Sequence, residues 1–215
     1  MKRALALALL LAVSACGKPA PAKVEAEVKK DTSALANIQV VKSPGGITAW
    51  LVQEKTVPVV AMEMAWRGGG STDPAGKDGA SWVLGYLMNE GAGDLNSQAF
   101  SSRMEDLNMS FGCTIGDDWS GCTLRTLAAT RKDSFDTVRL ALTSPRFEEE
   151  PLARAKRELS VNLMQAETDP GTIASRAMDK ALIPGHPYAR YATPDTVKTI
   201  TRDDIVALKN NLMTR

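Results

Sequence analysis

The segment Ala80–Met88 constrains the fold more than any other part of the chain. Its apolar residues recur at positions 80, 83, 84, 87 and 88, which is the spacing of a helix that packs one face inward. Loop residues Asp73, Pro74 and Gly76 lead into this segment and favour a helix start after them. Positions 82, 85 and 86 share about one turn of the predicted helix, because residues three and four apart lie on one face.

Three residues occupy those grouped positions, namely Trp82, Gly85 and Tyr86. The Gly-x-x-Gly approach and the helix resemble the metal-carrying helix of the insulinase-like (pitrilysin) metallopeptidases, which reads His-x-x-Glu-His. In that family the two histidines hold zinc and the glutamate is the base for the attacking water. The resemblance implies a third ligand, a glutamate on a later helix, and aligning the family's Asp-Pro landmark on Asp169-Pro170 puts that ligand at Asn162.

None of these four positions carries a group suited to zinc chemistry. An indole, a hydrogen and a phenol cannot replace imidazole nitrogen and carboxylate oxygen, and the neutral carbonyl of Asn162 is a poor zinc ligand. We therefore predict no catalytic residue, no metal ligand and no cofactor in this chain, with zinc expected only in a catalytic partner. For Trp82 and Tyr86 we expect aromatic packing that fills the cleft; the alternative is a remodelled cleft that binds peptide without cutting it. Gly85 costs about 1 kcal/mol of helix stability, which is tolerable where another segment approaches closely.

Further landmarks extend the resemblance from about Val40 to Leu212. They match, in order, the family's Gly-Ser-x-x-Asp-x-x-Gly loop, its Asn-Pro-x-Phe turn, its Gly-His-Pro-Tyr turn, its Thr-Pro turn and its Ile-Thr-x-Asp/Glu-Asp helix start. The matching segments are 67–74, 144–147, 184–188, 193–194 and 200–204. Each segment is weak evidence alone, and their order and spacing carry the resemblance.

The N-terminus has the features of a secretory signal. Lys2-Arg3 precede an apolar run from Ala4 to Val13, which is shorter than the ~20 residues that span a bilayer. Val13-Ser14-Ala15-Cys16 fits a bacterial lipobox, so we predict a signal peptide over 1–15 and acylation of Cys16; the alternative is an ordinary signal peptide with an incidental cysteine. Gly17 favours the outer membrane, with the protein facing the periplasm. Residues 16–35 are rich in Ala, Pro, Lys and Glu and are interpreted as a lipidated tether.

The remaining residues, 36–215, are long enough for one domain with a proper core. A formal net charge of +1 argues against a nucleic-acid partner. Members of the family usually carry two homologous halves, and no second copy of the pattern occurs in these 215 residues. We expect that a separate chain supplies the other half or that this chain is a fragment, and the abrupt ending favours the fragment.

Cys113 and Cys122 flank a stretch whose Gly-Asp-Asp and Ser-Gly pieces are typical of a β-hairpin turn. Cross-strand residues approach closely enough for a disulfide, and an exported protein meets an oxidising compartment. We predict a structural disulfide between them. Redox catalysis is a distant alternative, because the Cys-x-x-Cys spacing is missing.

The periodicity along the chain predicts a block of strands followed mainly by helices. Strands are expected over 38–42, 47–53, 58–66, 109–115 and 122–129, and helices over 80–88, 97–107, 149–167, 170–182 and 201–212. A further helix is expected to open at Thr130 with a capping box to Asp133. Asn96 or Ser97 is expected to cap the helix over 97–107. This order predicts an α+β domain with a largely antiparallel sheet and helices packed on one face, the architecture of an insulinase-like half.

Two other features receive structural interpretations. His186 is the only histidine, and we expect it to stabilise its Pro-Gly-His-Pro-Tyr turn by a hydrogen bond. The run Gly68-Gly69-Gly70 lacks the Lys-Ser/Thr of a nucleotide loop, so we expect a flexible connection next to the cleft.

The joint change at positions 82, 85, 86 and 162 within an intact framework favours a pseudopeptidase. The resemblance implies a non-catalytic subunit of a peptide-degrading protease complex in the bacterial cell envelope, held to the membrane by lipid. Its expected partners are a catalytic insulinase-like subunit and peptide substrates. Two alternatives stay open, an active zinc peptidase with non-standard ligands and a stand-alone binding lipoprotein of the envelope.

Overall fold

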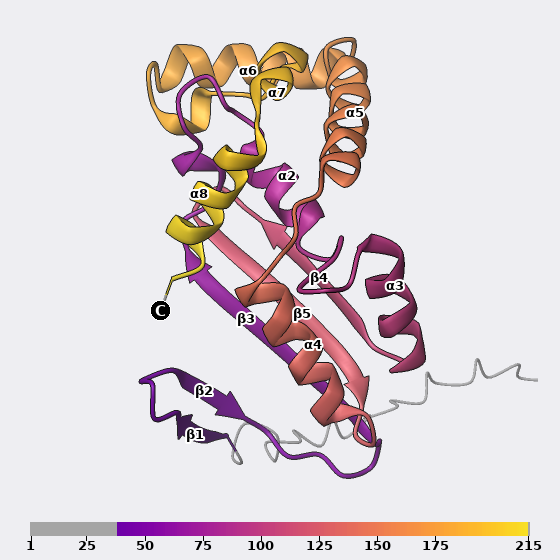
Figure 1. Ribbon diagram of the computed structural model, residues 1–215. Coiled ribbons are helices and arrows are strands. Elements are labelled where there is room, and N and C mark those ends of the chain that lie inside the picture. Colours follow the sequence, from indigo (N-terminus) through magenta and orange to yellow (C-terminus); the bar gives the residue numbers. More distant parts are fainter. Residues whose placement is uncertain (1–37, 215) are drawn as a thin grey trace, which may run out of the picture. The chain divides into compact units, whose positions relative to one another are not determined.

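A three-stranded antiparallel sheet supports the helices of the molecule (Figure 1). The computed structural model describes residues 38–214. The central strand is β5 (Trp119–Leu127), and it pairs with β3 (Val59–Arg67) on one side and with β4 (Ser110–Ile115) on the other. The predicted third, fourth and fifth strands are therefore confirmed within a few residues, and so is the antiparallel arrangement.

The first two predicted strands form a hairpin of their own. Strand β1 (Gln39–Lys42) pairs antiparallel with β2 (Thr48–Leu51) in a two-stranded sheet. The turn between them is closed by the amide of Gly46, which donates to the Ser43 carbonyl at 2.9 Å. This hairpin belongs to one compact unit of the chain, which ends at Gln53, and all other elements belong to a second unit that begins at Glu54.

Helices account for most of the second unit, so the predicted α+β class is confirmed. They are α2 (Ala80–Leu87), α3 (Ser97–Asp106), α4 (Arg131–Thr143), α5 (Glu149–Ala166), α6 (Pro170–Leu182), α7 (Pro194–Thr199) and α8 (Arg202–Leu212), with single 3₁₀ turns η1 (Gly70–Thr72) and η2 (Pro187–Ala189). Each helix predicted from the sequence is present. Helix α7 was not predicted.

Helices α3 and α4 pack on one face of the sheet of the second unit, and α2 packs against β4. Along β3 the residues alternate, with Met62 and Met64 half-buried towards the helices and Glu63 exposed on the other face. This alternation follows from the two-residue period of a strand. Trp119 of β5 lies on the open face, where its ring covers Gly121.

Two hydrophobic clusters hold the second unit together. One joins α2, α5, α7 and α8, and it includes Leu84, Leu159 and Ile205. The other joins the sheet to α3 and α4 through Phe100, Leu124 and other buried residues. Cys113, Leu142 and Met213 pack against both clusters, so the two behave as one connected core.

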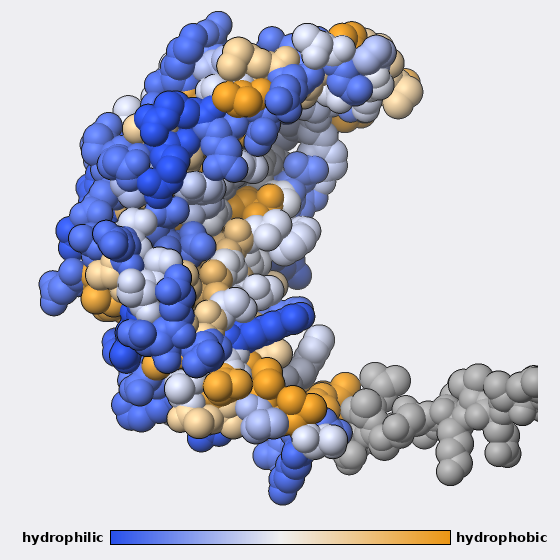
Figure 2. Space-filling model, turned by 90° about the vertical axis from the view of Figure 1, so that its right-hand side faces the viewer, coloured by the Kyte–Doolittle hydropathy of each residue, from blue (hydrophilic) through white to orange (hydrophobic). Residues whose placement is uncertain are grey.

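Helix α6 differs from the others because none of its residues is buried. Its apolar residues Ile173, Met178 and Leu182 are exposed. Figure 2 shows hydrophobic residues among hydrophilic ones at the end of the molecule that α5 and α6 form. Exposed large apolar residues on a helix that buries none of its residues are typical of a surface that meets another protein segment.

Local polar residues set where several helices begin. Asn96 caps α3 by accepting from the amide of Ala99 at 2.9 Å, which confirms one of the two predicted caps. Asp169 caps α6 and is followed by Pro170 at its first position. Thr193 and Thr201 open α7 and α8 with capping boxes.

The predicted capping box at Thr130 is wrong. Thr130 is the residue before α4, and its side chain makes no capping hydrogen bond. Its hydroxyl instead donates to the carbonyl of Leu107 at 2.8 Å and lies 3.1 Å from the hydroxyl of Thr126. The Thr130 hydroxyl therefore makes a tertiary hydrogen bond in place of the capping bond that the local pattern predicted.

The predictions for the N-terminus lie outside the described residues. These are the signal peptide over 1–15, the acylated Cys16 and the tether over 16–35, and they stay predictions. In the described part of the chain, no helix has the length and apolar character needed to cross a bilayer.

Candidate functional site

A buried aspartate fixes the start of α2, the helix that carries three of the predicted positions. The carboxylate of Asp73 accepts from the amides of Gly79 at 2.8 Å and Ser81 at 3.0 Å. These are two of the amide groups that a helix start leaves without an intrahelical partner. Burial raises the pKa of Asp73 above its usual range, and the hydrogen bonds from Gly79 and Ser81 act in the opposite direction. Asp73 therefore orients α2 from inside the protein.

Trp82 and Tyr86 lie in contact on α2. Their rings stack with centroids 5.7 Å apart and an interplanar angle of 21°. Trp82 is 37% exposed and Tyr86 is half-buried against the cluster that joins α2 to α5. The pair adds apolar contact area at the place where the family resemblance implies two zinc ligands.

Gly85 faces strand β4 at very close range. A Cβ atom at this position would lie 3.2 Å from the carbonyl oxygen of Cys113 and 3.2 Å from Cγ1 of Ile115. A hydrogen is therefore the side chain that this contact accommodates without movement of the neighbours. Strand β4 thus approaches α2 closely at Gly85, which is the condition under which a glycine is tolerable in this helix.

Arg154 of α5 connects the two helices next to the aromatic pair. Its Nε donates to the hydroxyl of Tyr86 at 3.2 Å, and one terminal nitrogen donates to Glu90 at 2.6 Å. The other terminal nitrogen donates to Glu150 at 2.7 Å, one turn earlier on α5. These bonds, led by the one to Tyr86, raise the pKa of Arg154. The guanidinium thus links α2 to α5, and its donor groups are already engaged.

Asn162 lies farther along α5 and is exposed. Its neighbours Leu159 and Leu163 are buried in the core that α5 shares with α2. The structure therefore places three of the four predicted positions together on α2, and the fourth on the helix packed against it. Their correspondence to the family's metal ligands stays a prediction.

The residues at these positions do not fit a zinc ion. Indole, glycine and phenol groups lack the nitrogen and oxygen ligands that zinc takes, and one carboxamide does not make a site. Among residues 38–214 no group of three or more His, Cys, Asp and Glu side chains could hold a metal ion. His186 is used in its turn, where Nδ1 accepts from the amide of Tyr188 at 3.2 Å, as the sequence predicted.

The predicted disulfide is present. Cys113 and Cys122 stand opposite each other on β4 and β5, and their sulfur atoms are bonded. Because the Cys113 carbonyl also meets Gly85, the disulfide stands directly beneath α2.

The expectation of a flexible connection at Gly68-Gly69-Gly70 is wrong. The amides of Gly68 and Gly70 donate to the carbonyls of Asp118 and Gly116, both at 2.8 Å. A Cβ at Gly69 would lie 2.0 Å from the Gly116 carbonyl oxygen. The glycines therefore serve close packing against the β4–β5 turn.

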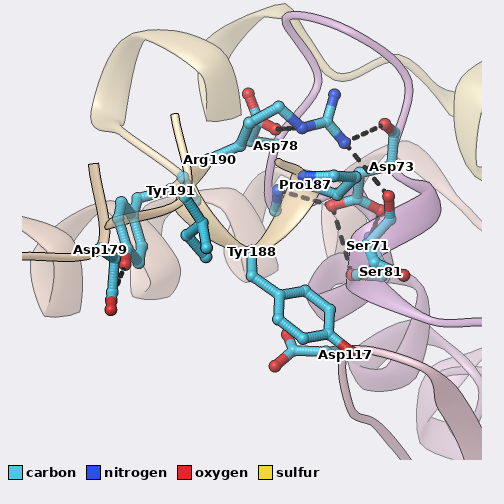
Figure 3. Close-up of a pocket in the computed structure, with 14 residues that line it drawn as sticks. Ser71, Asp73, Asp78, Ser81, Asp117, Asp179, Pro187, Tyr188, Arg190 and Tyr191 are labelled. Atoms are coloured by element: carbon cyan, nitrogen blue, oxygen red, sulfur yellow. Dashed lines mark hydrogen bonds and ion pairs between the residues drawn. The ribbon is translucent and has the colours of Figure 1, made fainter. Parts of the chain in front are cut away.

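A polar pocket of about 410 Å³ lies on the other side of the α2 start (Figure 3). Arg190 crosses it, donating to the carbonyl of Asp73 at 2.8 Å and lying 3.5 Å from the carboxylate of Asp78. Tyr191 donates to Asp179. The lining residues are Gly70, Ser71, Asp73, Asp78, Gly79, Ser81, Asp117, Asp179, Ile183, Pro187, Tyr188, Arg190, Tyr191 and Ala192.

The turn at the rim of this pocket is held by Asp118. Its carboxylate accepts from the hydroxyl of Ser71 at 3.0 Å and from the hydroxyl of Tyr188. The bond from Tyr188, followed by that from Ser71, lowers the pKa of Asp118, so the carboxylate stays charged. Sequence reasoning missed this pocket, because its walls come from three segments that are far apart in the chain.

Comparison with known proteins connects this geometry to a family. No family model matches the sequence. The "Non-peptidase homolog YmxG" of Helicobacter pylori is 24% identical over 151 residues, which cover 69% of this chain and 35% of that protein.

Two solved structures have a similar fold. The peptidase M16 inactive domain from Pseudomonas fluorescens matches with a TM-score of 0.73 and 24% identity, over 80% of this chain and 43% of that one. The periplasmic protease PqqL from Escherichia coli matches with a TM-score of 0.72 and 11% identity, over 82% of this chain and 20% of that one. This chain thus spans less than half the length of each of these relatives. It has the fold of the insulinase-like (M16) peptidases, and the family resemblance predicted from its sequence is confirmed.

Proposed function

We propose that this chain is a non-catalytic member of the insulinase-like family and serves as a peptide-binding subunit of a protease complex in the bacterial cell envelope. The observation that carries the proposal is the chemistry of positions 82, 85 and 86. A stacked aromatic pair and a glycine pressed against β4 stand where the resemblance implies metal ligands and a base. The names of the relatives, a non-peptidase homologue and an inactive domain, support the same conclusion.

Peptide capture requires no metal. In the described part of the chain, β3 and β4 each have one edge without a strand partner. An extended peptide can add to such an edge through backbone hydrogen bonds. Strand addition would therefore let the chain hold a peptide that a partner cuts.

A catalytic partner is the second part of the proposal. The relatives are more than twice as long as the part that this chain matches, so a homologous segment elsewhere would complete the assembly. The exposed apolar residues of α6 support a contact with another protein segment. We infer that zinc belongs to this partner, which would carry the intact His-x-x-Glu-His helix.

The location is part of the same proposal. The signal-like N-terminus and the lipobox at Cys16 favour an envelope lipoprotein at the outer membrane. A structural relative is described as periplasmic, which supports an envelope location.

The test measures hydrolysis, metal content and peptide binding of the purified chain. We expect no cleavage of a fluorogenic peptide mixture with or without added zinc, no stoichiometric zinc by elemental analysis, and saturable binding of labelled peptides. Chelator-sensitive hydrolysis with bound zinc would establish an active peptidase and overturn the proposal. Affinity capture from envelope extracts should recover a protein with an intact metal helix; recovery of partners without one would favour the stand-alone binding lipoprotein.

A further inference from the structure

Strand β3 leaves one edge of the three-stranded sheet open. In the described part of the chain, β5 pairs with one side of β3 and no strand pairs with the other (Figure 1). The backbone amides and carbonyls that point to the open side can be satisfied by an extended segment that joins the sheet as a further strand. The backbone of β3 therefore selects a polypeptide in extended form.

An apolar groove of about 290 Å³ lies between β3 and α4. Among residues 38–214 it is lined from these two elements alone, so it lies on the side of the sheet that β3 leaves open. Its apolar lining consists of Met62, Met64, Phe135, Val138 and Leu142. Arg139 also lines it, and the charge of this residue is offset by Asp136 at 3.5 Å. The groove therefore suits apolar side chains.

The edge of β4 differs, because its helix-facing side chains are already packed. Phe111 of β4 is 6% exposed. A Cβ at Gly85 of α2 would lie 3.2 Å from Cγ1 of Ile115, so α2 is in contact with β4. The helix-facing side chains Met62 and Met64 of β3 line a groove instead. The β3 edge is therefore the one that offers room to the side chains of an added strand.

The other face of β3 carries two exposed charges, Glu63 and Arg67, four residues apart. On β5 they stand opposite Thr123 and Trp119, which are uncharged. Within residues 38–214 neither charge forms an ion pair. An added strand of the antiparallel kind found in this sheet would place its own residues directly opposite these two charges. A basic residue facing Glu63 and an acidic residue facing Arg67 would stabilise the pairing, and the reverse would weaken it.

We propose that the β3 edge binds an extended segment of another polypeptide in which every second residue is apolar and an acidic residue precedes a basic one by four positions. The inference rests on the peptide binding proposed above, and it names the edge and the class of peptide. The alternate apolar side chains enter the groove between β3 and α4, because residues two apart in a strand point to the same face. The acidic and basic residues lie on the other face, opposite Arg67 and Glu63.

The test compares three fluorescein-labelled peptides with Gly-Ser flanks. The matched peptide has the core Glu-Val-Thr-Val-Lys-Val, the charge-reversed one has Lys-Val-Thr-Val-Glu-Val, and the polar one has Glu-Thr-Thr-Thr-Lys-Thr. Threonine keeps the branched shape of valine and loses its apolar character. Fluorescence anisotropy with the full chain at low salt should show the charge-reversed peptide binding about fivefold more weakly than the matched one, and the polar peptide about tenfold more weakly.

Two variants locate the binding on the sheet. The double variant Glu63→Lys with Arg67→Glu should reverse the preference, so that the charge-reversed peptide binds about fivefold more tightly than the matched one. The control exchanges two exposed charges of α5, Arg157→Glu with Glu158→Lys, and should keep the original preference. All four positions are exposed, so both variants should fold, which circular dichroism checks.

The outcomes separate this inference from the proposed function. A preference that stays the same in the folded β3 variant, or equal binding of all three peptides, overturns the inference. Binding of the peptide mixture described above without binding of the matched peptide also overturns it and leaves peptide capture intact. Absence of binding to any peptide overturns both. A chain that sediments as a dimer and excludes all three peptides makes a second copy the occupant of the edge, which overturns the inference as well.

Discussion

The α2–α5 region and the polar pocket lie on either side of the start of α2, and they differ in how far their polar groups are paired. In the α2–α5 region, formed by Trp82, Gly85, Tyr86 and Arg154, the two aromatic rings stack, Gly85 packs against β4, and the donors of the guanidinium are engaged in hydrogen bonds. In the polar pocket, a few residues away, the Nε of Arg190 makes no hydrogen bond within residues 38–214 and lies 3.5 Å from the Asp78 carboxylate. The residues of the α2–α5 region thus contact one another, while the neighbouring region holds a polar pocket.

The largest expected effect concerns the support beneath the α2–α5 region. Replacing both Cys113 and Cys122 with alanine should lower the free energy of unfolding by about 2–3 kcal/mol, because the disulfide restricts the conformations of the unfolded chain. Urea denaturation monitored by tryptophan fluorescence measures this. Unchanged protein with added reductant is the control, and it should lose a similar amount. An unaltered denaturation midpoint would show that the hairpin does not support this region.

The contact between Gly85 and β4 should be nearly as sensitive. Gly85→Val adds a branched side chain where a Cβ already lies 3.2 Å from the Cys113 carbonyl, and we expect a loss of about 2 kcal/mol from overpacking. The matched control is Gly112→Val, since a Cβ at Gly112 would meet no atom within 4 Å. Equal denaturation midpoints for the two variants would mean that the α2–α5 region is looser than described.

Removing the link between the two helices should have a smaller effect. Arg154→Ala breaks the bonds to Tyr86, Glu90 and Glu150, and because the pair with Glu90 is only partly buried we expect a loss of about 1 kcal/mol. Arg157→Ala on the same helix carries the same change in helix propensity at an exposed position. A chelator should change neither melting temperature. Equal losses in both variants would argue against the link.

The smallest expected effect concerns the pH dependence of stability at Asp73 and Asp169, two aspartates that each accept from amides at the start of a helix. Burial raises the pKa of Asp73, whereas hydrogen bonds from Thr172 lower the pKa of exposed Asp169. The contribution of Asp73 to stability is thus complete below the pKa of the unfolded chain and is lost as pH rises through the folded-state pKa. The contribution of Asp169 is present above the unfolded pKa and is lost as pH falls through the folded one.

Acid-range denaturation series of Asp73→Asn and Asp169→Asn check these signs. The stability lost in Asp73→Asn should shrink with rising pH, and that lost in Asp169→Asn should grow. A ¹³C NMR titration of the two carboxyl groups in the unchanged chain gives their pKa values directly. Shifts in the same direction would remove the distinction between the buried and the exposed helix start.

Local patterns in the sequence predicted much of the fold. Helix α6 was placed at its observed bounds, because Asp169 and Pro170 mark its start unambiguously. Helix α7 was missed, because six residues are too few to show a helical period and Thr193-Pro194 was interpreted as a turn. Thr130 was misassigned because its hydroxyl bonds to Leu107, which lies 23 residues away.

The α2–α5 region was predictable in residue identity and not in its links. Trp82, Gly85 and Tyr86 stand on one helix, so their grouping follows from helical spacing. Arg154 reaches Tyr86 across 68 residues, and Arg190 reaches Asp73 across 117. Such partners depend on how the helices pack, and the spacing of residues in the sequence does not predict that packing. The polar pocket was unpredictable for the same reason.

The disulfide has one more consequence for a chain proposed to work beside a protease. It joins the two strands on either side of the β4–β5 turn. A nick between Thr114 and Gly121 would leave both fragments covalently attached, so damaged molecules would migrate as a single band until a thiol reagent released the pieces.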